Sequence, residues 1–220
     1  MSVHVRSGAL RIVIVGAGGQ GKIVADILRA AEPLGGMHGV GFVDDGLWPD
    51  GARVMHLPVL GGVDALPHIE HDAVVVAIGD NAVRAAVSLA LEARGERIVT
   101  VQHPSASVSA EVELGPGCMV SAGAVITPCV RIGRGVLVNT NASIDHDSLV
   151  GDFAHIGPGA VSGGRVTIGA RALVGLGASV MSGCRVGDDA VVGAGAVVTR
   201  DVPDAVVVVG VPARVVRAVR

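Results

Sequence analysis

One histidine of this chain, His146, stands between two carboxylates, Asp145 and Asp147. Imidazole titrates near neutral pH, and an adjacent carboxylate can fix its tautomer and raise its basicity. The arrangement therefore suits a residue that transfers a proton. An exposed histidine without a function is the alternative interpretation. A metal site is less favoured, because the H-x-x-x-H spacing of zinc ligands and a cysteine in phase are both missing.

A glycine-rich segment near the N-terminus matches the pattern G-x-G-x-x-G and lies between a predicted strand and a predicted helix. In that context backbone N–H groups at the helix N-terminus can hold a phosphate. Glycines that only tighten the turn are the alternative. The candidate phosphate-binding residues are Gly16, Gly18, Gly19, Gln20 and Gly21.

Two further polar groups follow later strands at the same expected edge of a parallel sheet, where ligands bind. Asp44 and Asp45 would contact a ribose or a base. Gly79, Asp80 and Asn81 either contribute to the same site or cap a helix. NAD is the obvious ligand, but a dinucleotide needs two mononucleotide-binding halves, and about a hundred residues supply little more than one. A nucleoside diphosphate attached to another group fits better.

The elements that position these groups differ between the two parts of the chain. Up to His103, apolar runs at 10–15, 40–43 and 73–78 predict buried strands, and 22–31 and 82–94 predict helices. Strands alternating with helices indicate a parallel α/β sheet. We expect the domain boundary near His103-Pro104, giving domains 1–103 and 104–220.

The second part has a six-residue period. From Val108 to Val198 every sixth residue, the anchor, is Val, Ile or Leu, with Ser162 as the one exception, and the residue two positions earlier is always Ala, Val, Cys or Ser. Residues two apart on a strand share a face, so both should point inward. Gly follows nine of the sixteen anchors, as a positive φ or a close backbone contact would require. The period predicts short strands stacked into a parallel β-helix.

Composition excludes several partners. A net charge of −3 without a basic tract argues against nucleic acid as a partner.

Cys118 and Cys184 fall on inward positions and are expected to be buried thiols in a reducing compartment, whereas Cys129 lies off that phase. The N-terminus lacks a signal-peptide core, and the longest apolar stretch, 205–213, is too short to cross a bilayer. We expect a cytoplasmic protein without a membrane partner.

The chain resembles the hexapeptide-repeat acyltransferases, specifically the sialic acid O-acetyltransferase type that includes nucleotide-4-amino-sugar N-acetyltransferases. The resemblance covers nearly the whole chain and implies a Rossmann-like sheet followed by a left-handed β-helix, assembled as a homotrimer. The segments that carry it are IVIVGAGGQG (12–21), FVDD (42–45), AIGDN (77–81), HPSA (103–106), NTNASIDHD (139–147), DFAHIGPGA (152–160) and GVPAR (210–214).

The resemblance also implies roles for particular residues. His146 would be the general base, oriented by Asp147, and the glycine loop, Asp44, Asp45 and the AIGDN segment would hold a sugar nucleotide. Two residues depart from some family members, which carry His in place of Gln20 and Glu in place of Asp147. The positions implied for acetyl-CoA are His155, Gly164, Gly175, Gly210, Val211, Pro212, Ala213 and Arg214.

The function that the resemblance implies is transfer of acetyl from acetyl-CoA, without a metal, to the amino group of a nucleotide-linked 4-amino-4,6-dideoxy sugar. GDP-perosamine and a UDP-linked amino sugar both remain possible as acceptors, with a slight preference for the first. Acetylation of a sugar hydroxyl is the second hypothesis. A non-catalytic β-helix binding module is the third, and it is disfavoured by His146 and the aspartates on either side of it.

Overall fold

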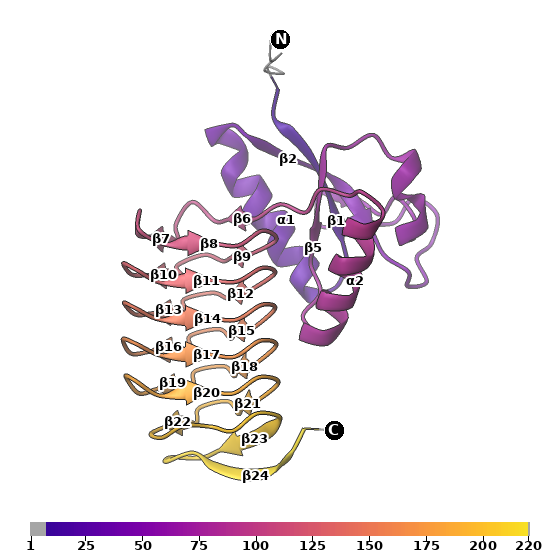
Figure 1. Cartoon of the computed structure of the whole chain (residues 1–220). Coiled ribbons are helices and arrows are strands. Elements are labelled where there is room, and N and C mark those ends of the chain that lie inside the picture. Colours follow the sequence, from indigo (N-terminus) through magenta and orange to yellow (C-terminus); the bar gives the residue numbers. More distant parts are fainter. Residues whose placement is uncertain (1–7, 220) are drawn as a thin grey trace.

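The computed structural model describes residues 8–219 and has two parts, an α/β sheet followed by a long coil of short strands (Figure 1). The first part contains β1 (Leu10–Val15), α1 (Gly19–Ala31), η1 (Glu32–Leu34), β2 (Met37–Val43), β3 (Arg53–Val54), β4 (Leu57–Pro58), η2 (Val63–His68), β5 (Ala73–Val76) and α2 (Asn81–Ala93). Three of these strands form a parallel sheet in the order β2-β1-β5.

Alternate residues of β1 enter two different cores. Ile12 and Ile14 pack with α1 on one face of the sheet, and Val13 and Val15 pack with Leu91 of α2 on the other. The period-two alternation thus buries both faces of the central strand. The predicted strand 10–15 agrees with β1, and the predicted helix 82–94 differs from α2 by one residue at each end. Helix α1 begins earlier than predicted, inside the glycine segment.

The second part is a three-sided β-helix in which equivalent residues of successive coils are 18 apart. The first sheet contains β7 (Ser107–Val108), β10 (Val125–Ile126), β13 (Ser143–Ile144), β16 (Val161–Ser162), β19 (Ser179–Val180) and β22 (Val197–Val198). The second contains β8 (Glu113–Leu114), β11 (Arg131–Ile132), β14 (Leu149–Val150), β17 (Thr167–Ile168) and β20 (Arg185–Val186).

The third sheet faces the α/β part and ends in the hairpin β23-β24, which lies at the far end of the coil (Figure 1). Its strands are β6 (Val101–Gln102), β9 (Met119–Val120), β12 (Leu137–Val138), β15 (His155–Ile156), β18 (Leu173–Val174), β21 (Val191–Val192), β23 (Val206–Val209) and β24 (Arg214–Ala218). Strand β6 precedes the boundary expected at His103-Pro104, and that boundary remains a prediction.

The predicted inward phase of the repeat is confirmed. The apolar anchors from Ile126 to Val198 and their apolar small partners form one buried core. Ser162 is buried among them, and its hydroxyl has no hydrogen-bond partner. Cys118 and Cys184 are buried as expected, whereas Cys129 is exposed.

The corners of the coil differ from the expectation about glycine. Positive φ occurs at the third residue after each anchor from Leu114 to Val192, and that residue is often not glycine, as at Asp147 (φ 58°). The glycines directly after the anchors lack positive φ, so that part of the expectation is wrong. They permit close backbone contact instead: a Cβ on Gly115 would lie 2.6 Å from the carbonyl carbon of Gly133.

The α/β part is packed directly on the coil. Met119 and Leu137 point outward from the third sheet, yet they are buried in the same core as α1. This apolar contact fixes α1 and the glycine loop against the coil, and hydrogen bonds from Asn81 and Arg84 hold the start of α2 there. Within the described residues, no helix is long and apolar enough to cross a membrane.

Candidate active site

His146 lies at the corner between β13 and β14 and is paired with Asp147. Its Nδ1 is 2.8 Å from Asp147 Oδ2, and the two side chains are 48% and 56% exposed. A carboxylate accepts only, so Nδ1 carries the proton, and in the neutral imidazole Nε2 keeps its lone pair. The local arrangement is that of a base with a fixed tautomer.

The backbone around His146 is held by two neighbours. Asp145 Oδ1 accepts a hydrogen bond from the His146 amide (2.9 Å) and one from Thr127 Oγ1 (3.1 Å). These bonds lower the pKa of Asp145, with the amide as the main cause. Gly164, one coil further on, leaves room for the imidazole: a Cβ there would lie 2.6 Å from Cε1 and Nε2 of His146.

His155 belongs to a different side of the coil. It points outward from β15 toward the α/β part, and Asn139 Nδ2 lies 3.2 Å from its Nε2. Burial, and to a lesser extent the charge of Arg84, lower the pKa of His155 to about 4. The imidazole is therefore neutral at pH 7, and if Asn139 donates to Nε2, the proton is on Nδ1.

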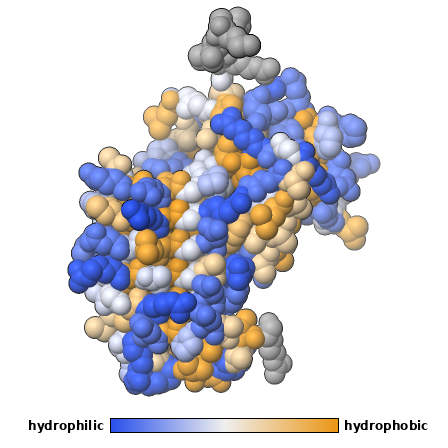
Figure 2. Space-filling view, viewed as in Figure 1, coloured by the Kyte–Doolittle hydropathy of each residue, from blue (hydrophilic) through white to orange (hydrophobic). Residues whose placement is uncertain are grey.

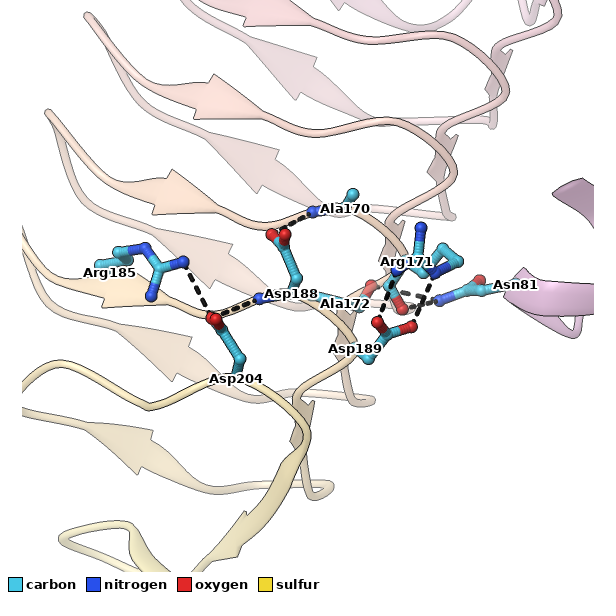
Figure 3. Close-up of polar contacts among 8 residues, drawn as sticks. All are labelled: Asn81, Ala170, Arg171, Ala172, Arg185, Asp188, Asp189 and Asp204. Carbon is cyan, nitrogen blue, oxygen red and sulfur yellow. Dashed lines mark hydrogen bonds and ion pairs between the residues drawn. The ribbon is translucent and has the colours of Figure 1, made fainter. Parts of the chain in front are cut away.

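A pocket of about 280 Å³ lies where the start of α2 meets the third sheet. It brings together two predicted groups from different parts of the chain, the Gly79–Asn81 loop and His155. Asn81, Arg171 and Asp189 converge there (Figure 3). The Arg171 guanidinium pairs with both carboxylate oxygens of Asp189 (2.7 and 2.6 Å). The remaining lining residues are Ala82, Leu173, Val191 and Val219.

Asp80 and Asn81 both have structural partners. Asp80 Oδ1 accepts from the Val83 amide at 2.9 Å, so the helix-cap interpretation is correct for this residue. Asn81 Nδ2 donates across the interface to the carbonyls of Arg171 (2.8 Å) and Ala172 (3.2 Å). A role of either residue in ligand binding stays a prediction.

The glycine segment forms the expected strand-to-helix loop. Gly16 has a φ of 101°, and a Cβ on Gly21 would lie 2.1 Å from the Gly16 carbonyl oxygen. The Lys22 amide donates to the Gly18 carbonyl (3.1 Å), so the amides of Gly19, Gln20 and Gly21 precede the first helical bond. Such amides are suited to an anion. The Gln20 side chain points to the coil, 3.8 Å from Met119 Sδ.

The two aspartates after β2 hold loops in place. Asp44 accepts from the amides of Ala17 (2.7 Å) and Gly46 (2.9 Å) and from Trp48 Nε1 (2.9 Å). Burial by itself would raise the pKa of Asp44, but these hydrogen bonds outweigh it and the pKa is lowered. Asp45 Oδ1 accepts from the Val63 amide at 2.8 Å. Asp44 therefore links the glycine loop to the segment that carries Trp48.

The remaining residues predicted for acetyl-CoA are dispersed. Residues 210–213 form the turn between β23 and β24, and Arg214 is the first residue of β24. The Ala213 amide donates to the Val197 carbonyl (2.8 Å). Gly175 follows β18, where a Cβ would lie 2.6 Å from the Val192 carbonyl oxygen. A single chain thus leaves His146 and His155 on different sides of the coil.

A larger hollow is lined by none of the predicted site residues. It is an open groove of about 710 Å³ over β8, β11, β14 and β17, and Figure 2 shows hydrophobic surface on the coil bordered by hydrophilic residues. The chemistry of the predicted groups favours the smaller pocket. Among the described residues no cluster of three or more His, Cys, Asp or Glu side chains could hold a metal ion.

Sequence reasoning missed Arg84, Arg171 and Asp189. The Arg171–Asp189 pair joins equivalent corner positions 18 residues apart, a spacing that the repeat itself supplies. Arg84 lies one turn after Asn81 in α2 and is fully buried. The sequence pattern around Arg84 is a polar residue at the start of a helix followed three positions later by a cation. This pattern is only a weak signal of a buried polar contact.

Comparison with known proteins agrees with this geometry. The PglD N-terminal domain family matches residues 11–91, and the hexapeptide repeat of succinyl-transferase family matches 108–128 and 165–200. A GDP-perosamine N-acetyltransferase from Escherichia coli O157:H7 is 32% identical over 144 residues, which span 64% of this chain and 64% of that protein.

Two solved structures are similar over nearly the whole chain. PerB from Caulobacter crescentus, in complex with CoA and GDP-perosamine, is 39% identical with a TM-score of 0.86, covering 96% of this chain and 98% of that one. The acetyltransferase domain of PglB from Neisseria gonorrhoeae FA1090, in complex with acetyl coenzyme A, is 34% identical with a TM-score of 0.87, covering 95% and 100%.

These similarities define a class, the hexapeptide-repeat acyltransferases with an α/β sheet followed by a left-handed parallel β-helix. Within it, the chain belongs to the family of acetyl-CoA-dependent sugar N-acetyltransferases that includes the perosamine N-acetyltransferase of Caulobacter crescentus.

Proposed function

We propose that the protein transfers the acetyl group of acetyl-CoA to the 4-amino group of a nucleotide-linked 4-amino-4,6-dideoxy sugar, with GDP-perosamine as the preferred acceptor. The observation that carries the proposal is the His146–Asp147 pair, a base with a free Nε2, in a chain similar to proteins bound to CoA and GDP-perosamine. A sugar N-acetyltransferase needs a proton acceptor of this kind.

The reaction follows from the lone pair of the amine. This lone pair attacks the thioester carbon, and the carbonyl π electrons move to oxygen to form a tetrahedral adduct. His146 Nε2 takes the proton that the nitrogen loses, while Asp147 stabilises the resulting imidazolium through Nδ1–H. The adduct collapses, the C–S bond breaks, and the sulfur of CoA leaves with the proton. No acyl-enzyme forms.

His155 is suited to a different role. As a neutral imidazole it can donate a hydrogen bond from Nδ1 to the oxyanion of the adduct, or to the acetyl carbonyl before attack. Its depressed pKa keeps it from competing with His146 as the base. The acetyl carbonyl would then be polarised by the His155 imidazole, which Asn139 holds in place.

The nucleotide site in this proposal is the carboxyl edge of the β2-β1-β5 sheet, in domain 1–103. The free amides at the start of α1 would bind the diphosphate. Asp44 acts through the loop that it ties together, because three protein donors already occupy its carboxylate. Domain 104–220 would bind acetyl-CoA through Gly164, Gly175, residues 210–214 and His155.

A homotrimer in which subunits share each active site would reconcile the positions of the two histidines. They are nine residues apart, half of an 18-residue coil, so one chain presents them on different sides. The β-helix of a neighbouring subunit can bring its own His146 to the pocket that contains His155. Hybrid trimers of an inactive His146→Ala chain and an inactive chain lacking residues 210–214 should regain activity. Complete absence of activity in verified hybrids would contradict a shared site.

The acceptor is tested by incubating the purified protein with acetyl-CoA and a panel of sugar nucleotides, and measuring CoA release. The panel pairs GDP-perosamine with a UDP-linked 4-amino sugar, and each with its 4-hydroxy counterpart. We expect the highest kcat/KM for GDP-perosamine. Turnover of the hydroxy sugars alone would establish O-acetylation, and no turnover of any acceptor would refute the proposal.

A further inference from the structure

Arg84 of α2 is fully buried at the interface between the α/β part and the coil. Its acceptors are all uncharged: the carbonyls of Gly135 (2.8 Å), Phe153 (2.7 Å), Ala154 (3.4 Å), Ile78 (2.9 Å) and Gly79 (3.2 Å), and Asn81 Oδ1 (2.8 Å). Burial lowers the pKa of this guanidinium to about 10, so it stays protonated at neutral pH. A buried cation without a direct carboxylate partner is costly.

The acceptors form two groups. Gly135 and Phe153 occupy the same corner of successive coils, 18 residues apart, and Arg171 follows at the next coil. Arg84 donates to the carbonyls of Gly135 and Phe153, and Asn81 donates to the carbonyl of Arg171. Asn81 in turn accepts a hydrogen bond from Arg84 through its Oδ1. Ile78 and Gly79 belong to the loop that is proposed to contact the sugar nucleotide. One guanidinium therefore ties that loop directly to two consecutive coils, and through Asn81 to a third.

Apolar packing through the core that contains Met119, Leu137 and α1 already joins the two parts, so the interface does not depend on Arg84 alone. What a guanidinium adds is direction: five N–H donors in one plane fix the relative orientation of every acceptor.

We propose that Arg84 is a positioning residue for acetyl transfer, which sets the distance and angle between the Ile78–Asn81 loop and the His155 side of the coil. This inference rests on the proposed function, because it assumes an acceptor held by the loop and an acetyl group held by the coil. A displacement of about 1 Å between reacting groups costs on the order of a hundredfold in rate. The two ligands would still bind.

The test compares Arg84→Lys with Arg94→Lys, a matched control at the C-terminal cap of the same helix, whose native partner is the exposed Asp64. Lysine keeps the charge but has one nitrogen, which cannot reach both groups of carbonyls. We expect Arg84→Lys to lower kcat at least tenfold, while the Kd values for CoA and for GDP-perosamine, from calorimetry, change less than threefold. The control should retain wild-type kcat.

Arg84→Gln is the second variant if the lysine variant does not fold, because it removes the charge and keeps one donor nitrogen. A kcat within twofold of wild type in a folded variant would overturn the proposal. So would failure of both variants to fold, which would make Arg84 structural. A rise in either Kd in proportion to the fall in kcat would overturn the proposal as well. Lack of activity in the wild-type protein would instead refute the proposed function.

Discussion

Replacing His146 with asparagine should remove most of the turnover and leave the fold unchanged. The imidazole presents Nδ1 to Asp147 at 2.8 Å and leaves Nε2 free. An asparagine has no group that accepts a proton near neutral pH. The side chain is 48% exposed and belongs to none of the apolar cores, so little packing is lost.

The size of the effect follows from the role of a general base. Such a base contributes about 10²- to 10⁴-fold to a reaction rate, which corresponds to about 2.7 to 5.4 kcal/mol of transition-state stabilisation. We expect kcat of His146→Asn to fall at least a hundredfold. Asp147→Asn should fall less, by about tenfold, because the imidazole remains and only the orienting charge is lost.

The assay is release of the CoA thiol at saturating acetyl-CoA and sugar nucleotide, with oligomeric state checked by gel filtration. His38→Asn is a matched control, since His38 is also half-exposed and its Nδ1 lies 2.8 Å from Glu32 Oε1. That variant should be fully active. Near-normal turnover of His146→Asn would show that the amine arrives deprotonated and that His146 is not the base.

Three other predictions concern the loop, the core and pH. Asp44→Asn should raise KM for the sugar nucleotide about tenfold, since each hydrogen bond to a charged carboxylate contributes about 1.5 to 3 kcal/mol, and leave the Kd of acetyl-CoA unchanged in calorimetry. Val174→Asp places a charge in the coil core and should abolish soluble expression, whereas Ser162→Val should match or exceed the wild-type Tm. Because the pKa of His155 is lowered to about 4, the unfolded chain binds a proton there between pH 6.5 and 4 that the folded chain does not. The Tm should therefore fall with pH in that window, and fall less in His155→Asn.

The fold could be predicted to the level of individual inward residues because a fixed period constrains every position at once. An error of one residue in phase would have put Val174 or Ile144 in solvent, and both are buried. Corner geometry was less predictable. Glycines after the anchors suggested positive φ, but that conformation falls two residues later, on side chains such as Asp147 and Arg171.

The site could be predicted only in parts, because contacts between the two parts of the chain have no local signature. His155 directly precedes the anchor Ile156, so the repeat predicts that it faces outward, either exposed or at an interface. Only the packing of the α/β part on the third sheet decides between the two. The same packing created the environment of Arg84. Its partners lie up to 70 residues away in sequence, which no local pattern reveals.

The most direct test of the account is the position of the acetyl group in the product. Two-dimensional NMR of the compound formed from acetyl-CoA and GDP-perosamine should show an amide proton coupled to H4 of the sugar and a carbonyl correlated with that proton. An acetyl ester on a sugar hydroxyl, with the 4-amino group unchanged, would contradict the central claim.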